Sequence, residues 1–406
     1  MLCSERRDDA NGWLDHMLES LTMILEALEV HDFRNLSGKI TWGHGLNIIY
    51  GNNGQGKTSW LEAIHILART KSFRTQRLQE SIRFGEQIAV VRGKVSNSGE
   101  SGVGLERDLQ VTLHDNSKTI FVNAKRETLT RYLTQLQVFS FTASDLEVVR
   151  GTPEARRRFL DRGISSIRPA YLRTIADYNR VIKQKNKVLQ AANENEFPLN
   201  KTEDLIGPWN DQLAKLGAEI HTRREEYVVG LNEVLERQLF ERRDVTTRYV
   251  SSLEGKGDLT DYESLLRSRL ALRLVAEVAS GHALIGPHRD DLDIHLDGRE
   301  IRAFGSSGQQ RSALLILDLA AISLYNLAAN DQPVFIIDDV DAELDEKRIR
   351  HLLEYLENRT QTFITTSKRN HVEGFFSRAN VYEIAEGGVR SSQARSDLAS
   401  AGSSLA

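Results

Sequence analysis

Residues 51–58 read Gly-Asn-Asn-Gly-Gln-Gly-Lys-Thr, and this segment constrains the fold more than any other. It matches the pattern G-x-x-x-x-G-K-S/T without a mismatch. An apolar stretch, Leu46–Tyr50, precedes it and predicts a buried strand, while Ser59–Arg69 has the apolar spacing of a helix. In this context the glycines let successive N–H groups point at a phosphate, and the start of the helix adds its positive end. The sequence therefore predicts a P-loop that binds ATP or GTP.

The residues of this loop have separate expected roles. Lys57 should contact the β- and γ-phosphates, and the Thr58 hydroxyl should bind Mg²⁺. A flexible Gly/Asn turn is the alternative, but the flanking strand and helix favour the phosphate site. The residues expected to bind the nucleotide are Gly51, Asn52, Asn53, Gly54, Gln55, Gly56, Lys57 and Thr58.

Length and composition indicate a globular protein. The chain has 406 residues, 40% of them hydrophobic and 27% charged, which suffices for two domains or for one head with an insertion. A net charge of -4 excludes a chain that is basic throughout but not a local basic face. The single cysteine, Cys3, excludes a disulfide framework. No apolar run approaches the roughly 18 residues of a membrane span, and no signal peptide is evident. We expect a cytoplasmic protein.

Strand-like and helix-like stretches divide the chain. Residues 1–22 are expected to be an extension. A mis-assigned start codon would explain it, and the alternative is a short additional helix at 14–21. Residues 23–150 alternate like short strands and predict an antiparallel subdomain around the P-loop. Residues 151–280 have helical periodicity, so we expect a helical arm inserted into the head, with a turn at 193–205. Residues 281–390 are expected to form the second half of the head, and residues 391–406 a disordered tail. Within the second half we expect a helix at Ser312–Leu327 and strands at Asp291–Leu296, Glu300–Phe304, Val334–Ile337 and Thr362–Thr365.

The predicted strand Val334–Ile337 ends in two acids, Asp338 and Asp339. A P-loop ATPase needs an acid at the end of a neighbouring strand to hold Mg²⁺, and we assign Asp338 to this role. Hydrolysis also needs a group that orients or deprotonates the attacking water, and Asp339 is the candidate. Many strands end in Asp at a turn, so the argument depends on the pairing with the P-loop.

A third segment, Phe304–Arg311, immediately precedes the apolar helix and reads Phe-Gly-Ser-Ser-Gly-Gln-Gln-Arg. Small and polar residues at a helix N-terminus form an anion-binding surface. The segment resembles the signature motif of ABC-type ATPases, which reaches the γ-phosphate bound by the opposite subunit of a dimer. Asp341–Asp345 resembles the D-loop of the same class. The resemblance makes Ser306 and Gln309 candidate contributors to the chemistry.

Longer motifs resemble those of the RecF family, bacterial recombination-repair proteins related to the SMC/Rad50 heads. Two positions depart from the family, because it usually has Gln where Ser307 stands and Pro where Ala143 stands. The resemblance implies an α/β fold, an ABC-type (Rad50/SMC-like) P-loop ATPase head with an antiparallel β subdomain and an inserted α-helical arm. The matching motifs are His31–Asn35, Gly51–Thr58, Phe141 with Asp145-Leu146, Arg156–Asp161 and Gly286–Asp291.

The resemblance also implies a function. ATP would hold two copies face to face on single-stranded, double-stranded or gapped DNA, and slow hydrolysis would release them, so the ATPase is a switch. Such a protein would act with RecO and RecR to load RecA, and would support replication forks and SOS induction. Arg34 and Asn35 would touch the nucleotide, with a surface turn as the alternative. Other hypotheses are a similar head acting with a nuclease or defence partner, and another ABC-type or helicase ATPase.

A basic stretch suggests where DNA would bind. Residues 150–190 contain eleven Lys and Arg against three acids, an electrostatic footprint suited to phosphate. The alternative is a charge-rich, solvated arm with a structural Arg156–Arg158 at its base. His288 and the acids at 290, 291 and 293 do not match zinc or calcium spacing, so we expect a structural loop there. The candidate DNA contacts are Arg156, Arg157, Arg180, Lys183, Lys185 and Lys187.

Overall fold

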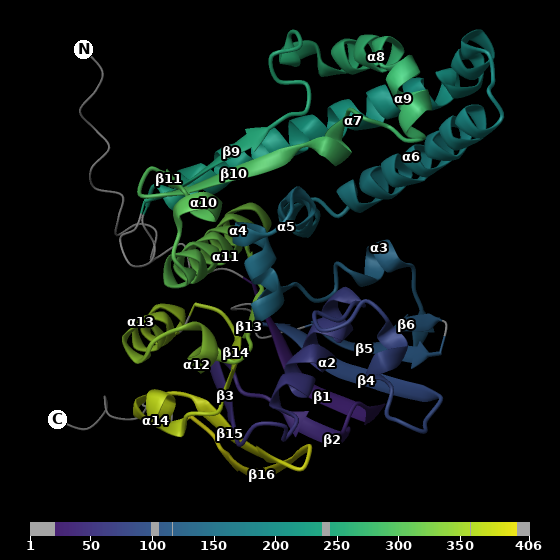
Figure 1. Ribbon diagram of the computed structural model, residues 1–406. Helices are drawn as coiled ribbons and strands as arrows, with labels where there is room; N and C mark the ends of the chain where they lie inside the picture. The colour runs from purple at the N-terminus through teal and green to yellow at the C-terminus, as the bar shows by residue number, and fades with distance from the viewer. Residues whose placement is uncertain (1–20, 99–104, 116, 238–243, 358, 396–406) are drawn as a thin grey trace. The chain divides into compact units, whose positions relative to one another are not determined.

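The computed structural model describes residues 21–98, 105–115, 117–237, 244–357 and 359–395 (Figure 1). The described chain forms two compact units, one from the residues up to 145 and from 325 onwards, the other from 146–324. The extension 1–22 lies outside the described residues except for Leu21 and Thr22, which open the first strand. The expected helix at 14–21 also falls outside them.

The first unit contains an antiparallel sheet, as the alternating pattern predicts. The strand order is β12-β1-β4-β5-β6-β7, with β2 paired to β1 and only the β12 edge running parallel to its neighbour. The strands are β1 (Leu21–Phe33), β2 (Leu36–Thr41), β4 (Ile88–Ser98), β5 (Leu105–His114), β6 (Lys118–Val122), β7 (Lys125–Arg126) and β12 (Asp331–Gln332).

A second, mostly parallel sheet in the same unit positions the P-loop. Its order is β16-β15-β3-β14-β13-β8, and every pair from β15 to β8 is parallel. The carboxyl ends of β3, β14 and β13 therefore lie at one edge of the sheet, where open α/β sheets bind ligands. The strands are β3 (Leu46–Tyr50), β8 (Val138–Phe141), β13 (Val334–Ile337), β14 (Thr362–Thr366), β15 (Asn380–Ala385) and β16 (Gly388–Gln393).

One apolar core joins the two sheets. The helix that follows the P-loop, α2 (Lys57–Arg69), contributes Trp60, Leu61 and Ile64 to it, and the core includes buried residues of both sheets. Trp42 packs edge-on against Trp60 and Phe363, with ring centroids 6.4 Å and 5.1 Å apart. This packing fixes α2, and with it the start of the P-loop helix. Shorter helices of the unit are α3 (Leu129–Tyr132), α12 (Val340–Glu343), α13 (Glu346–Leu356) and α14 (Arg369–Val372).

The second unit consists mainly of helices, and in Figure 1 α6 runs beside part of the longer α7. A three-stranded sheet, ordered β11-β10-β9, contacts α7 through β9 and α5 through β10. The elements are α4 (Glu147–Arg150), α5 (Pro153–Ile167), α6 (Tyr171–Glu194), α7 (Leu199–Leu235), β9 (Val245–Val250), α8 (Tyr262–Leu272), α9 (Leu274–Ser280), β10 (Asp291–Leu296), β11 (Arg299–Glu300) and α10 (Ile301–Phe304), and then α11 (Ser307–Ala329), whose last residues belong to the first unit.

Several local expectations are wrong. The helical expectation for 151–280 misses β9, and 300–304 forms β11 and α10 in place of a strand. The turn between α6 and α7 is only 195–198, shorter than the predicted 193–205. β16 extends to Gln393, into the segment predicted as disordered, while 396–406 lie outside the described residues.

Residues 281–324 group with the helical unit, whereas we expected them in the head. The reason is pairing, because β10 forms a ladder with β9 and its preceding loop packs on the arm. His288 Nδ1 lies 2.8 Å from the Tyr178 hydroxyl, and the Arg224 guanidinium donates to the Pro287 carbonyl at 2.7 Å. These contacts give the loop the structural role that we expected for it.

α11 differs from the expectation that no apolar run is long enough to span a membrane. Among the described residues it is the one helix that is long and apolar enough to cross a membrane. Yet 67% of its most apolar stretch is buried, which is typical of a core helix in a globular protein.

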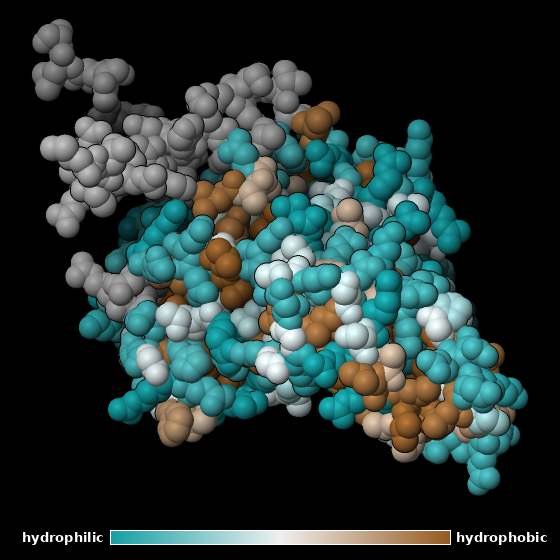
Figure 2. Space-filling view, turned by 90° about the horizontal axis from the view of Figure 1, so that it is seen from above, coloured by the Kyte–Doolittle hydropathy of each residue, from teal (hydrophilic) through white to brown (hydrophobic). Residues whose placement is uncertain are grey.

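On the face of the molecule shown in Figure 2, hydrophilic residues predominate and hydrophobic ones form smaller groups.

The arm contains a buried ion pair between Lys185 of α6 and Glu277 of α9. The Lys185 Nζ and a Glu277 carboxylate oxygen are 2.6 Å apart, and both side chains are fully buried. The other Glu277 oxygen accepts a hydrogen bond from the Leu284 N–H at 2.9 Å. Lys185 belongs to the buried stripe of α6, between Val181 and Leu189. The pair thus fixes α9 and the segment after it against α6.

Replacing one partner of this pair tests its structural role. Lys185→Met leaves the Glu277 charge buried without its counter-ion, and such a change costs about 3–5 kcal/mol. We expect the free energy of unfolding, measured by urea denaturation, to fall by this amount. The double variant Lys185→Met with Glu277→Leu should recover most of the loss. Two single losses that simply add in the double variant would contradict a direct pair.

Candidate functional site

The P-loop has the backbone that its glycines predict. Gly51 has a φ of +151°, and a Cβ there would meet the Ile384 carbonyl oxygen at 2.4 Å. Gly56, immediately before α2, has a φ of +105°, which side-chain-bearing residues rarely adopt. The loop can therefore turn tightly from β3 into α2 only with glycine at these positions.

The β15–β16 turn supports the loop from behind. Gln55 Oε1 accepts a hydrogen bond from the Glu386 N–H at 2.7 Å, and the Gly387 N–H donates to the Gln55 carbonyl at 2.9 Å. Trp60 Nε1 donates to the Gly387 carbonyl at 3.1 Å. No local pattern in the sequence indicates this support, because the partners lie more than 300 residues further along the chain.

Lys57 folds back over the loop that precedes it. Its Nζ donates to the carbonyls of Gly51 and Asn52 at 2.7 and 2.9 Å. Burial lowers the pKa of this lysine, and the negative charges of Asp339, Asp341 and Asp338 partly offset this lowering. Its hydrogen-bond partners are neutral carbonyls. A bound phosphate would give the ammonium a negatively charged partner, which these carbonyls do not provide.

Asp338, which follows β13, connects helix α2 with strand β14 at the edge of the parallel sheet. Its Oδ1 accepts hydrogen bonds from Thr58 Oγ1 at 2.9 Å and from Thr365 Oγ1 at 2.7 Å. Burial raises the pKa of Asp338, and the two hydroxyls act in the opposite direction. The Thr58 and Asp338 oxygens are hard ligands in adjacent positions, which fits Mg²⁺ bound through few protein groups. The residues assigned to the metal are thus brought together.

Asp339 lies beside this carboxylate in a strained conformation. Its φ of 52° places it in the left-handed region, and its N–H donates to Thr365 Oγ1 at 2.7 Å. Burial raises the pKa of its carboxyl, and the negative charges of Asp341 and Asp338 raise it further. A carboxyl with a raised pKa is better suited to accept a proton from water than an ordinary one.

The P-loop, Asp339 and Thr365 line a cavity of about 900 Å³, within the size range of ligand pockets. Arg34 and Asn35, the two residues suggested by resemblance, line it as well. One wall was not predicted from the sequence, and it comes from the segment after α2. Its residues are Arg74, Glu80, Ile82, Arg83 and Phe84.

A buried glutamate of α2 holds two arginines of this cavity. Glu62 is fully buried and accepts hydrogen bonds from Arg34 Nε at 3.0 Å and Arg34 Nη2 at 2.7 Å. It also accepts from Arg74 Nη1 at 3.1 Å and Ser72 Oγ at 2.6 Å. Burial alone would raise the pKa of Glu62, but the bonds from Arg34 and Ser72 and the two arginine charges lower it. Glu62 was missed because its spacing in α2 shows no sign of the partners.

The signature segment lies in the second unit and caps α11. The Ser306 N–H donates to Gln309 Oε1 at 2.9 Å, and the Gln309 N–H donates to Ser306 Oγ at 3.3 Å. This reciprocal pair is a capping box, and it fixes the first turn of the helix. Ser306 and Ser307 are exposed. In the first unit, Asp341 of the D-loop accepts hydrogen bonds from Ser367 N and Oγ at 3.1 and 2.7 Å.

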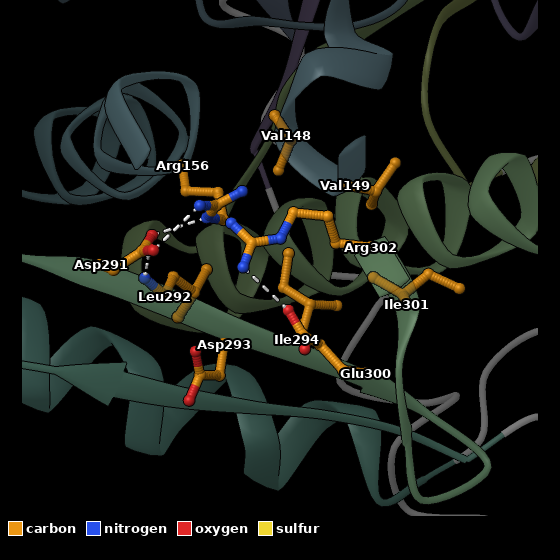
Figure 3. A pocket seen from close by; sticks show the side chains of 10 residues that line it. All are labelled: Val148, Val149, Arg156, Asp291, Leu292, Asp293, Ile294, Glu300, Ile301 and Arg302. Carbon is orange, nitrogen blue, oxygen red and sulfur yellow. Dashed lines mark hydrogen bonds and ion pairs between the residues drawn. The ribbon is translucent and has the colours of Figure 1, made fainter. Parts of the chain in front are cut away.

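Two of the predicted DNA contacts are wrong, because their side chains are buried in ion pairs. Lys185 is the buried partner of Glu277, and Arg156 makes a two-bond pair with Asp291 at 2.6 and 2.9 Å. Figure 3 shows this pair beside a hollow of about 10 Å³, barely enough for one water. The signal was present in the sequence, since the neighbours at i−4 and i+4 of Lys185 are apolar.

The other basic candidates differ in exposure. Arg157 is half-buried and donates to the Asp290 carbonyl at 2.6 Å, so it is largely committed to the arm. Arg180 is exposed and lies 3.0 Å from a carboxylate oxygen of Asp177. Lys183 and Lys187 are exposed on α6, one turn apart, with no ion pair within the described part of the chain. These two lysines remain the candidates for phosphate contact.

Comparison with family models matches residues 24–389 to the RecF/RecN/SMC N terminal domain. The chain is 32% identical over 379 residues to the DNA replication and repair protein RecF of Ruminiclostridium cellulolyticum, covering 91% of this chain and 100% of the relative. It is 35% identical over 385 residues to the protein of the same name from Lactobacillus johnsonii, covering 90% and 99%.

Two solved structures are similar over nearly the whole chain. The recombination mediator protein RecF-ATPrS in the RecFOR pathway has a TM-score of 0.81 and 30% identity, covering 92% of this chain and 99% of its own. RecF-ATP in the same pathway has a TM-score of 0.80 and 29% identity, covering 92% and 100%. The SmcHead bound to the C-winged helix domain of ScpA is similar in fold, with a TM-score of 0.51 and 15% identity.

The hydroxyl of Thr365 supplies a test of the metal site. Thr365→Val keeps the shape but removes the donor to Asp338 and the acceptor for the Asp339 N–H. Loss of an outer hydrogen bond of this kind typically weakens metal affinity roughly 10–100-fold. We therefore expect calorimetry to show weaker ATP binding with Mg²⁺ and little change in EDTA. Thr365→Ser, which keeps the hydroxyl, should bind like the parent; equal losses in the two variants would contradict this role.

Proposed function

The chain belongs to the RecF family, within the RecF/RecN/SMC N-terminal domain family, and from this membership we propose that it is an ATP-dependent DNA-binding protein of replication and recombinational repair. The relatives are named for replication and repair, and two similar structures are RecF with ATP or ATPrS. The single observation that carries the nucleotide assignment is the 2.9 Å hydrogen bond between Thr58 and Asp338, next to a cavity that Thr58 and Lys57 line.

We propose that ATP acts by joining two copies of the chain. The P-loop and Asp338 bind the triphosphate with Mg²⁺, which neutralises phosphate charge when it is bound. The exposed Ser306 and the half-buried Gln309 at the start of α11 complete the site of the opposite copy, because a helix N-terminus attracts anions. Asp339 then activates the attacking water, and slow hydrolysis releases the dimer.

The proposed partners follow from the family. The dimer holds single-stranded, double-stranded or gapped DNA, with Lys183 and Lys187 among its phosphate contacts. It works with RecO and RecR to load RecA, supports replication forks and SOS induction, and acts in the cytoplasm. The naming of the RecFOR pathway for two similar structures supports the assignment to RecO and RecR.

Two variants test the switch. Lys57→Ala removes the ammonium that meets the phosphates, so we expect loss of ATP binding and of ATP-dependent dimers in sedimentation velocity. Asp339→Asn keeps the shape but cannot accept a proton, so dimers should form with ATP and persist. ADP serves as the control nucleotide and should leave the parent chain monomeric. Dimers of Lys57→Ala at unchanged ATP affinity, or normal hydrolysis by Asp339→Asn, would refute the assignments.

The two exposed lysines of α6 are tested by salt dependence. Lys183→Gln with Lys187→Gln should weaken duplex binding and lower the slope of log K against log salt by roughly 0.9 for each phosphate that is no longer neutralised. The matched control is Lys39→Gln with Lys125→Gln, which changes the net charge equally at exposed positions of the first unit. An identical slope in the α6 variant and the parent would assign both lysines to solvent.

A further inference from the structure

Phe84 is the most exposed large hydrophobic side chain among the described residues. Its relative exposure is 103%, so essentially no atom of the ring is covered. It is also the one member of this exposed group that lines the cavity of the P-loop. A fully hydrated aromatic ring at a ligand cavity gains free energy when a flat partner covers it.

The backbone on both sides of Phe84 is held firmly, although its ring is free. The Arg83 N–H donates to the Asp32 carbonyl at 2.7 Å, and Ile82 forms a β-bridge with Phe33. The Glu86 N–H donates back to the Arg83 carbonyl at 3.0 Å, which closes a turn around Phe84 and Gly85. The backbone that carries the ring is thus held by the β1–β2 region before any ligand arrives, which lowers the entropic cost of stacking.

Its neighbour Arg83 is turned to other partners. Arg83 Nη2 donates to Ser37 Oγ at 2.9 Å, and Nε lies 3.6 Å from a carboxylate oxygen of Asp32. Arg34 and Arg74 are likewise held by Glu62. The arginines that line the cavity therefore already have partners, whereas the Phe84 ring offers an apolar surface that is free to bind a ligand.

The cavity has two chemically different parts. Lys57 and Thr58 suit the polyanionic end of a nucleotide, whereas Phe84 offers a flat apolar face. We propose that Phe84 is the platform on which the base of the bound nucleotide stacks. The proposal rests on the assignment of the P-loop as a nucleotide site. Because every base has a π-face, this contact raises affinity without selecting adenine over guanine.

The test compares nucleotides with a ligand that has no base. Phe84→Ala should bind ATP and GTP about ten-fold more weakly than the parent, in line with the loss of one aromatic stack. Inorganic tripolyphosphate, measured with the same Mg²⁺ and at protein concentrations too low for self-association, should bind both proteins equally. Leu105→Ala is the matched control, since Leu105 is 68% exposed in the same unit and does not line the cavity.

Phe84→Trp adds a direct signal. It should retain ATP affinity, and the introduced indole should be quenched by ATP but not by tripolyphosphate. Unchanged ATP affinity of Phe84→Ala, or equal loss for ATP and tripolyphosphate, would overturn the proposal. Normal affinity with reduced ATP-dependent self-association would instead make Phe84 a contact between copies, and would overturn it too. Lys57→Ala separates the two assignments, because failure of the nucleotide site removes tripolyphosphate binding as well.

Discussion

The nucleotide site depends on one carboxylate that joins segments far apart in the chain. Asp338 accepts hydrogen bonds from Thr58 of the P-loop helix and from Thr365 of β14. This is possible because β14 lies between β3 and β13 and all three strands run parallel. Thr365 also accepts the Asp339 N–H, so one hydroxyl positions both acids. The register of this sheet therefore determines the geometry at which phosphate, metal and water would meet.

Several buried charges among the described residues have a charged partner within ion-pair distance. Glu62 is neutralised by two arginines, and Lys185 by Glu277. Burying a charge without such compensation is costly, so these pairs hold structure. Lys57 is also buried, but its hydrogen bonds go to two neutral carbonyls. A triphosphate would supply a directly bonded negative partner, in agreement with the role that we propose for this lysine.

The sequence predicted the fold class, which the family match and the similar structures confirm, because the P-loop and its flanking elements are local patterns. The strand Val334–Ile337 and its two acids are also local, and they were placed correctly. The prediction of DNA contacts from the basic stretch was partly wrong for a specific reason. Counting charges over 150–190 ignores helical phase, whereas Lys185 stands four residues from both Val181 and Leu189 on a buried stripe. β9 was missed because a short strand within a helical region has too few residues to change the periodicity.

The way in which the arginines of the cavity are held could not be predicted from the sequence, since it depends on tertiary contacts. Arg34 comes from the β1–β2 turn and Arg74 from the segment after α2, and both meet at Glu62. The same turn holds the backbone beside Phe84 through the Asp32 carbonyl. Glu62 lies in the helix that begins at Lys57, so the P-loop and this wall share one rigid support. A ligand bound at the P-loop would therefore meet a wall already in place, and its affinity would depend on the antiparallel sheet as well as on the loop.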